Sequence, residues 1–253
     1  MRRIVPLLLL PILATLAAFT VARAEDSGFT PAQRAEIVSI LRHALATDPT
    51  ILRDAVAALR EDEAERKEAA SRDALVQYQA ALTADPADPQ AGDPHGDVTV
   101  VEFYDLQCPY CRTMVPALAQ LLHSDAHVRL VYKDIPVLGP GSQLGARAVL
   151  AARLQSADGY AKLQEAIMQG SRQISEDSLR ADAARAGLDW PRLRHDMADP
   201  AIAARLQTNL DLARALGVEG TPVFVIGKRM VPGAVALAEL QTAVSAARAG
   251  TAQ

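Results

Sequence analysis

The only two cysteines of this 253-residue chain are separated by two residues, in the tetrapeptide Cys108-Pro109-Tyr110-Cys111. The apolar run 98–104 precedes them and a helix-compatible stretch follows, so the pair lies at a predicted strand-to-helix junction. The free N–H groups and the dipole of a helix N-terminus favour a thiolate over a thiol, and two sulfurs at this spacing can close a disulfide within one turn. The tetrapeptide therefore predicts a redox-active dithiol that exchanges disulfides.

A metal site is the main alternative use of such a pair. Half of a structural zinc site has this spacing, but it needs two further ligands, and the histidines show no spacing that supplies them. The five histidines are His43, His95, His123, His127 and His195. Two thiolates alone would suit cuprous ion, so copper bound by Cys108 and Cys111 stays as an alternative. Otherwise the redox-active disulfide is the only reacting group, and no cofactor is predicted.

The N-terminus has the pattern of a secretory signal peptide over residues 1–24. Two arginines precede an apolar segment at 4–21, and Ala22-Arg23-Ala24 offers a small-x-small cleavage site. We predict cleavage near Ala24 and export to the periplasm or another oxidising compartment. A membrane anchor is the alternative reading, but two prolines interrupt the apolar segment and no second one follows. A disulfide between two cysteines this close together cannot link distant parts of an exported fold. The pair is therefore available for disulfide exchange.

Composition narrows the classes of partner. Hydrophobic residues make up 50% of the chain and charged residues 22%, which is typical of a soluble globular protein. The formal net charge of -4 gives no footprint for binding a polyanion. Nucleic acid is therefore not expected as a partner.

Residues 25–82 are predicted to form helices that lack a core of their own. Thr30-Pro31-Ala32-Gln33 combines an N-cap, a first-turn proline and a capping-box partner, and a second helix start is predicted at Asp48-Pro49. Apolar residues recur at helical spacing, as at Ile37, Leu41, Ile51 and Leu59. This stripe must be buried against the main domain or against another copy of the chain, so a homo-oligomer formed through residues 25–82 is one hypothesis. Residues 83–96 collect proline, glycine and aspartate and are predicted to be a linker.

The pattern from residue 97 onward predicts an α/β fold. A buried-strand run, a helix and a second β-rich run form a βαβ unit at 98–104, 112–123 and 128–132. Helical periodicity then fills about 142–216, and two short strands and a final helix follow at 223–226, 230–231 and 234–247. Residues 97–253 are therefore expected to form one domain with the order βαβ, helical insertion, ββα.

Three features together carry a family resemblance. The stretch from Glu102 to Cys111, the helical insertion and Gly220-Thr221-Pro222-Val223-Phe224 resemble the DsbA branch of the thioredoxin superfamily, in the same order along the chain. The N-terminal helices and the segment 137–142 further resemble exported proteins of the ScsC type, the suppressor of copper sensitivity group. The resemblance implies a thioredoxin-like fold and a protein thiol-disulfide oxidoreductase. It also implies two kinds of partner, exported cysteine-containing proteins and a membrane redox partner.

The resemblance also implies roles for the residues of the tetrapeptide. Cys108, nearer the helix start, would be the nucleophile, with its sulfur partly exposed. Cys111 would be the resolving thiol, which attacks the mixed disulfide and releases the substrate. Pro109 would restrict the connecting backbone, and Tyr110 would alter the surroundings of the sulfurs by packing.

Two further sites follow from the same resemblance. Pro222 would be a cis-proline facing the dithiol, and it would turn the backbone of Thr221 toward an extended substrate peptide. Glu102 matches the acidic residue beneath the active site and could accept the proton of Cys111. The alternation of a strand equally permits Glu102 to face solvent, so both orientations stay open.

The direction of electron flow is read from the dipeptide between the cysteines. Pro-Tyr, with Thr221 before the proline, resembles isomerase and reductase members, whereas strongly oxidising monomers usually carry Pro-His there and often Val before the proline. A histidine can stabilise a thiolate by its charge, and neutral Tyr110 cannot. We therefore expect an isomerase or reductase. The alternatives are a monomeric DsbA-like oxidase and a copper-stress protein that uses the same cysteines.

Overall fold

The computed structural model describes residues 28–170 and 173–250. The predicted signal peptide, residues 1–24, lies outside the described ranges. The chain divides into two compact units, with the boundary between Glu61 and Asp62, inside helix α2 (Pro49–Gln77). Of the helices in these ranges, none combines the length and the apolar character that a membrane span requires.

The first unit consists of α1 (Pro31–Thr47) and the beginning of α2. The predicted capping box is present, since the Thr30 hydroxyl accepts from the Gln33 backbone N–H at 3.3 Å and the Gln33 side chain accepts from the Thr30 N–H at 2.8 Å. No residue of α1 is buried. The large apolar side chains of this unit are all exposed, among them Ile37, Val38, Ile40, Leu41, Leu45, Ile51, Leu52, Val56 and Leu59.

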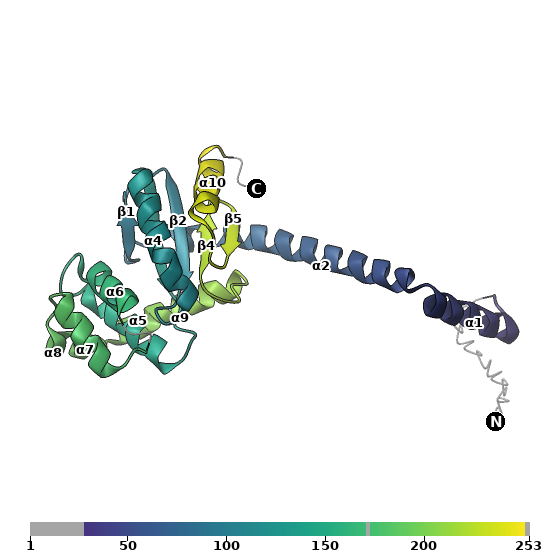
Figure 1. The fold of residues 1–253 in the computed structure, drawn as a ribbon, viewed down its shortest axis with the longest axis horizontal. Helices are drawn as coiled ribbons and strands as arrows, with labels where there is room; N and C mark the ends of the chain where they lie inside the picture. Colours follow the sequence, from purple (N-terminus) through teal and green to yellow (C-terminus); the bar gives the residue numbers. More distant parts are fainter. Residues whose placement is uncertain (1–27, 171–172, 251–253) are drawn as a thin grey trace, which may run out of the picture. The chain divides into compact units, whose positions relative to one another are not determined.

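The second unit is built on a mixed five-stranded sheet with the order β1-β3-β2-β4-β5. The strands are β1 (Gln90–Gly92), β2 (Val98–Tyr104), β3 (Val128–Asp134), β4 (Val223–Ile226) and β5 (Arg229–Pro232). β2 and β3 are parallel, as the predicted βαβ unit requires, and the other neighbouring pairs are antiparallel. β2 is the middle strand of this sheet (Figure 1), and the two cysteines follow its carboxyl end in the chain.

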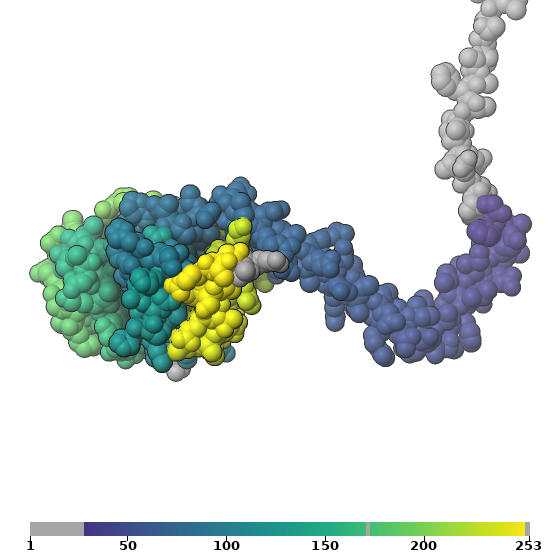
Figure 2. Space-filling model, turned by 90° about the horizontal axis from the view of Figure 1, so that it is seen from above, coloured from purple at the N-terminus to yellow at the C-terminus, as the bar shows by residue number. Residues whose placement is uncertain are grey.

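Helices cover both faces of this sheet. α4 (Pro109–Ser124) and α10 (Leu237–Arg248) pack on one face, and Figure 2 shows α10 in yellow alongside α4 in teal. The other face is covered by α9 (Pro200–Ala215), by α3 (Gln79–Thr83) and by Leu75 near the end of α2. Burial on both faces explains why β2 is nearly continuously apolar.

The predicted helical insertion consists of successive helices between β3 and β4. These are α5 (Pro140–Ala152), α6 (Gly159–Gln169), α7 (Glu176–Arg185), α8 (Trp190–Asp196) and α9. Their apolar side chains form a separate cluster, which also contains Cys108 and Cys111. The insertion thus forms one wall around the dithiol.

Residues 83–96, which the composition predicts to be a linker, are instead part of the sheet domain. β1 pairs antiparallel with β3, with Gln90 opposite Val131 and Gly92 opposite Arg129. The guanidinium of Arg129 donates to the backbone carbonyl of Thr83 at 2.8 Å. This segment therefore forms the edge of the sheet and does not separate two domains.

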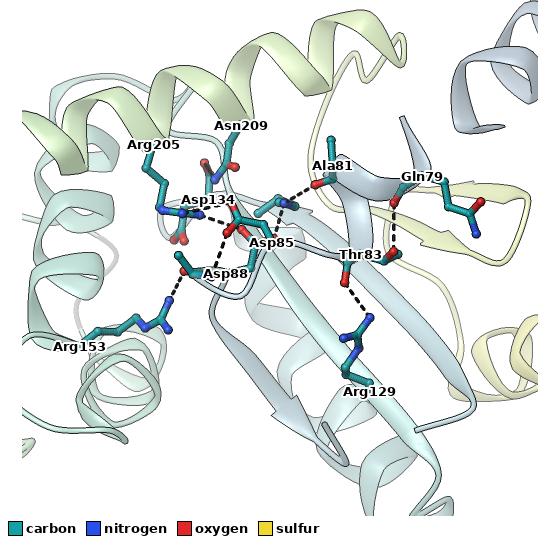
Figure 3. Close-up of polar contacts among 12 residues, drawn as sticks. Gln79, Ala81, Thr83, Asp85, Asp88, Arg129, Asp134, Arg153, Arg205 and Asn209 are labelled. Atoms are coloured by element: carbon teal, nitrogen blue, oxygen red, sulfur yellow. Dashed lines mark hydrogen bonds and ion pairs between the residues drawn. The ribbon is translucent and has the colours of Figure 1, made fainter. Parts of the chain in front are cut away.

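A buried ion-pair network attaches the same segment to β3 and α9 (Figure 3). Lys133 and Asp88 are 2% and 4% exposed, and the Lys133 ammonium lies 2.5 Å from the Asp88 carboxylate and 2.8 Å from the Ala81 carbonyl. Arg205 pairs with Asp88 at 3.0 Å and with Asp85 at 3.1 Å. Because a buried ammonium must be paired, this network fixes residues 81–88 on the sheet.

Candidate active site

The dithiol lies at the N-terminus of α4. Cys108 is the N-cap residue, with φ -67° and ψ 119°, and Pro109 follows at the first helical position. Both cysteines are free thiols. They lie three positions apart across the first turn of the helix, so a disulfide between them needs little rearrangement of the backbone.

The loop before β4 brings the second predicted site residue to the dithiol. The Cys108 Sγ donates to the Thr221 carbonyl oxygen at 3.2 Å, and the Thr221–Pro222 bond is cis, as the resemblance implies. The pairing of Phe103 on β2 with Val223 on β4 sets this juxtaposition, because it fixes where the two loops leave the sheet.

The two cysteines are more buried than the sequence analysis expects of a nucleophile. Cys108 is 3% exposed and Cys111 is 1% exposed. The contact with Thr221 and the packing of the helical insertion account for the burial of Cys108. Tyr110 between them is 64% exposed, so its ring reaches solvent beside the buried sulfurs.

Glu102 lies within the central strand β2, flanked by Tyr132 on β3 and Phe224 on β4. Its side chain is buried, so the solvent-facing orientation is wrong. Burial, and secondarily the charge of Asp134, raise the pKa of Glu102 to about 8. Burial also raises the pKa of the Cys111 thiol far above its usual range, and the charge of Glu102 adds to that increase. The carboxyl group and the resolving thiol are therefore electrostatically coupled.

A second buried acid, which the sequence analysis does not single out, lies one strand away. The Asp134 carboxylate accepts from the Tyr104 hydroxyl at 2.7 Å and from the Tyr160 hydroxyl at 3.0 Å. Burial raises the pKa of Asp134 to about 7. Tyr104 is opposite Asp134 in the parallel register of β2 and β3, whereas Tyr160 comes from α6. From the sequence, this pairing of Tyr104 with Asp134 could have been predicted only by aligning the two expected parallel strands in the correct register.

Asp105 holds the active-site loop to the segment that follows β3. One carboxylate oxygen accepts from the backbone N–H groups of Val137 and Leu138, at 2.9 and 3.0 Å. The other accepts from the Ser142 hydroxyl at 2.7 Å and from the Gln107 N–H at 2.8 Å. These bonds explain how the segment 137–142, noticed in the sequence, contributes to the site: it fixes the loop that leads to Cys108.

The surroundings of the dithiol offer no metal-binding cluster in the part of the chain that the structure describes. No group of three or more His, Cys, Asp or Glu side chains there is placed to hold a metal ion.

We expect the substitution Glu102→Gln to remove a pH-dependent loss of stability. The usual pKa of the Glu102 carboxyl is 4.5 and its folded value is about 8, so between these values the folded chain holds a proton that the unfolded chain has lost. Stability should therefore fall as pH rises through this window, by up to about 1.4 kcal/mol for each pH unit.

Urea unfolding of the reduced protein at pH 5 and pH 8 measures this effect. Between pH 5 and pH 8, the free energy of unfolding of the wild type should fall by a few kcal/mol more than that of Glu102→Gln. Glu239→Gln, at an exposed position of α10, is the matched control and should follow the wild type. Identical pH dependence in all three proteins would show that Glu102 does not carry this proton.

Comparisons with family models agree with this geometry. The model of the DSBA-like thioredoxin domain matches residues 99–245, which is more than half of the chain. The model of the copper resistance protein ScsC N-terminal domain matches residues 33–66.

Among curated relatives, the Na(+)/H(+) antiporter NhaA 1 of Salinispora arenicola is 33% identical over 172 residues, which are 66% of this chain and 26% of the antiporter. The chain thus spans about a quarter of that relative's length. The probable disulfide bond formation protein D of Bacillus cereus is 28% identical over 153 residues, which are 56% of this chain and 71% of that protein.

Solved structures extend the likeness to the N-terminal helices. A thioredoxin-like oxidoreductase from Silicibacter pomeroyi is 43% identical and covers 67% of this chain and 97% of its own, with a TM-score of 0.65. Proteus mirabilis ScsC in a transitional conformation is 28% identical and covers 88% of this chain and 98% of its own, again with a TM-score of 0.65. The chain belongs to the family of DSBA-like thioredoxin domains, in the ScsC-type form with an N-terminal helical region.

Proposed function

We propose that this protein exchanges disulfides with cysteine-containing substrate proteins through Cys108 and Cys111. The observation that carries this proposal is the position of the Cys108 sulfur. Cys108 lies at the start of helix α4, and its sulfur is 3.2 Å from the carbonyl oxygen of Thr221. A peptide that forms backbone hydrogen bonds beside Thr221 would bring its own sulfur to the nucleophile. The positive end of the α4 dipole would favour the thiolate that attacks.

In the reducing direction, the Cys108 thiolate attacks one sulfur of a substrate disulfide. A Cys108–substrate disulfide forms, the substrate S–S bond breaks, and the departing thiolate takes up a proton. The Cys111 thiolate then attacks the Cys108 sulfur, which forms the Cys108–Cys111 disulfide and releases the second substrate thiol. Two electrons pass from the dithiol to the substrate, and the reverse sequence oxidises a substrate. The exchange as proposed needs no cofactor besides the redox-active disulfide.

Glu102 can accept the proton that Cys111 must lose before it attacks the mixed disulfide. The pKa of Cys111 is raised well above neutral by burial, so its thiol must lose a proton before it can attack. The pKa of Glu102 is about 8, which is suited to exchanging a proton near neutral pH, and its charge is coupled to the thiol. We assign Glu102 the role of a general base for Cys111.

The surroundings of the dithiol favour isomerisation or reduction over oxidation. Tyr110 carries no charge that would stabilise the Cys108 thiolate, in contrast to a histidine at the same position. A less stabilised thiolate makes the disulfide less oxidising, so the dithiol stays at least partly reduced. A monomeric oxidase is the alternative, and a role in copper stress through the same two sulfurs is secondary because a third ligand is lacking among the described residues.

The first unit favours assembly, which suits an isomerase. Its large apolar side chains are 39–61% exposed along α1 and the start of α2. A contiguous apolar helix face of this kind is buried in a stable protein, and a second copy of the same chain offers a matching face. An oligomer would bring several dithiols to one substrate, so that one thiol can attack while another resolves.

Light scattering, run in parallel with refolding of scrambled ribonuclease, tests the proposed function. Leu41→Glu places a charge on the apolar face and should reduce the measured mass to that of one chain, with loss of most refolding activity. Arg42→Glu places the same charge on an exposed position one residue away and should leave both unchanged. A wild-type chain that is already monomeric would contradict the isomerase proposal and favour the oxidase or reductase.

We also propose that the protein is exported, because its N-terminus has the pattern of a signal peptide. The charged start, the apolar segment and the triplet ending at Ala24 support export with cleavage near that residue. A similar solved structure is described as a periplasmic thioredoxin-like protein from Salmonella enterica serovar Typhimurium, with 32% identity. Exported cysteine-containing proteins would be the substrates, and a membrane redox partner would reset the dithiol.

A further inference from the structure

A groove begins at the active site and extends away from it between two elements of the second unit. Its volume is about 660 Å³. One wall is the loop 217–223 together with the β4–β5 hairpin, and the other is the part of α2 between Ala64 and Leu75. Thr221 and Pro222 line the groove, and Thr221 is the residue whose carbonyl accepts from Cys108. A chain bound at Cys108 can therefore continue into it.

The two walls of the groove are attached to each other. The Lys67 ammonium lies 2.8 Å from the Glu219 carboxylate, and the Ser71 hydroxyl lies 3.3 Å from the sulfur of Met230. Leu75 is buried beneath them in the same apolar cluster as Met230. These contacts make the second half of α2 part of the active-site surface.

Charge is distributed unevenly along this groove. Six charged residues line it, of which Lys67 is paired with Glu219, and Arg72 with Glu68 at 2.9 Å. The two that remain, Lys228 and Arg229, are exposed on the β4–β5 hairpin, and neither forms an ion pair with any other described residue. The groove therefore carries two uncompensated positive charges, although the whole chain has a formal net charge of -4.

The hairpin also offers hydrogen-bonding groups to an extended chain. β5 is the last strand in the sheet order, so one of its edges is not paired with another strand of the described sheet. Strand edges of this kind accept an added peptide through backbone bonds, while side-chain pockets and charges select the sequence. The apolar side chains of Leu75, Val218 and Met230 line or underlie the same path.

We propose that this groove binds the segment of substrate next to the reacting cysteine, and that Lys228 and Arg229 select segments with acidic side chains. This inference rests on the proposed disulfide exchange and names the class of substrate that the site takes. Because the net charge of the whole chain would repel an acidic peptide, a preference for one must come from local charges such as these.

Peptide mixed disulfides provide the test with the full-length reduced protein. Three extended peptides carry one cysteine each, linked to 2-thiopyridine, and differ only in having glutamate, glutamine or lysine at the neighbouring positions. Attack by Cys108 releases 2-thiopyridone, whose absorbance gives the second-order rate constant. We expect the acidic peptide to react about three- to tenfold faster than the basic one at low salt, with the difference shrinking as salt is added.

Charge-reversal variants assign the effect to the groove. Lys228→Glu and Arg229→Glu should each reduce the preference, whereas Arg180→Glu, the same change at an exposed position of α7, should not. Dithiodipyridine, a small disulfide with no peptide, should react equally with every variant. Equal rates for the three peptides, or a preference unaltered by both hairpin variants, would overturn the inference. Failure to release 2-thiopyridone from any of these disulfides would instead overturn the proposed exchange itself.

Discussion

Cys108→Ser should abolish the reduction of protein disulfides, with a loss on the order of a thousandfold or more in rate. The exchange requires a thiolate that attacks a disulfide sulfur, and a serine hydroxyl at this position cannot replace it. Cys111 cannot take over, because burial raises the pKa of its thiol far above its usual range. The measurement is turbidity during insulin reduction by dithiothreitol, with and without the protein.

The control for this substitution is a check that the variant keeps its fold and assembly. Serine is close to cysteine in size and can still lie at the N-cap of α4, so circular dichroism and light scattering should be unchanged. A Cys108→Ser protein that keeps its assembly and loses its activity supports the enzyme. Retained insulin reduction in that variant would exclude Cys108 as the nucleophile.

Asp88→Ala should lower the free energy of unfolding by about 3–5 kcal/mol. The substitution leaves the Lys133 ammonium, which is 2% exposed, and the Arg205 guanidinium without their shared carboxylate partner. An unpaired charge inside the protein is far less favourable than the pair, whereas the same deletion at the surface has little effect. Urea denaturation measures the difference.

Two further variants distinguish the effect of losing the Asp88–Lys133 ion pair from the effect of losing packing contacts. Asp158→Ala removes the exposed partner of Lys162 and should change stability by less than about 1 kcal/mol. Replacing Asp88 and Lys133 together by leucine and methionine should recover most of the loss, because no unpaired ammonium then remains. A loss below about 1 kcal/mol for Asp88→Ala would mean that water reaches Lys133 and that the network does not hold the segment.

The parts of the fold that follow from the sequence are those with long, regular patterns. The βαβ unit, the helical insertion and the capping box at Thr30 all rest on residues close together in the chain, where spacing alone decides the element. The dithiol is predictable for the same reason, since four consecutive residues and a helix start define it. Thr221 reaches Cys108 across 113 positions, and only the family resemblance predicts that contact.

The segment 83–96 shows where local composition misleads. Its prolines, glycines and aspartates are typical of a solvated linker, yet Asp88 is buried because Lys133, 45 positions later, needs a partner. Lys133 and Asp134 are neighbours in the chain, but adjacent strand residues point to opposite faces. Lys133 therefore meets Asp88, whereas Asp134 meets Tyr104 and Tyr160.

The orientation of Glu102 could not be predicted for a related reason. Alternation distinguishes an inner face from an outer one only when one face of the sheet meets solvent, and β2 is covered on both. Either orientation therefore buries the carboxyl, and its pKa is raised in consequence. The exposure of Cys108 also depends on a distant element, the loop at Thr221, which the pattern around the cysteines does not reveal.

Trapping substrates with Cys111→Ala tests the central claim most directly. Without the resolving thiol, the bond between Cys108 and a substrate cannot be cleaved from within the protein, so mixed disulfides should accumulate. The account predicts adducts with exported proteins that are joined at Cys108, disappear on treatment with dithiothreitol, and are missing when Cys108 is also replaced by serine. If no such adducts form under mild oxidation, or if they persist in the double variant, exchange through Cys108 is contradicted.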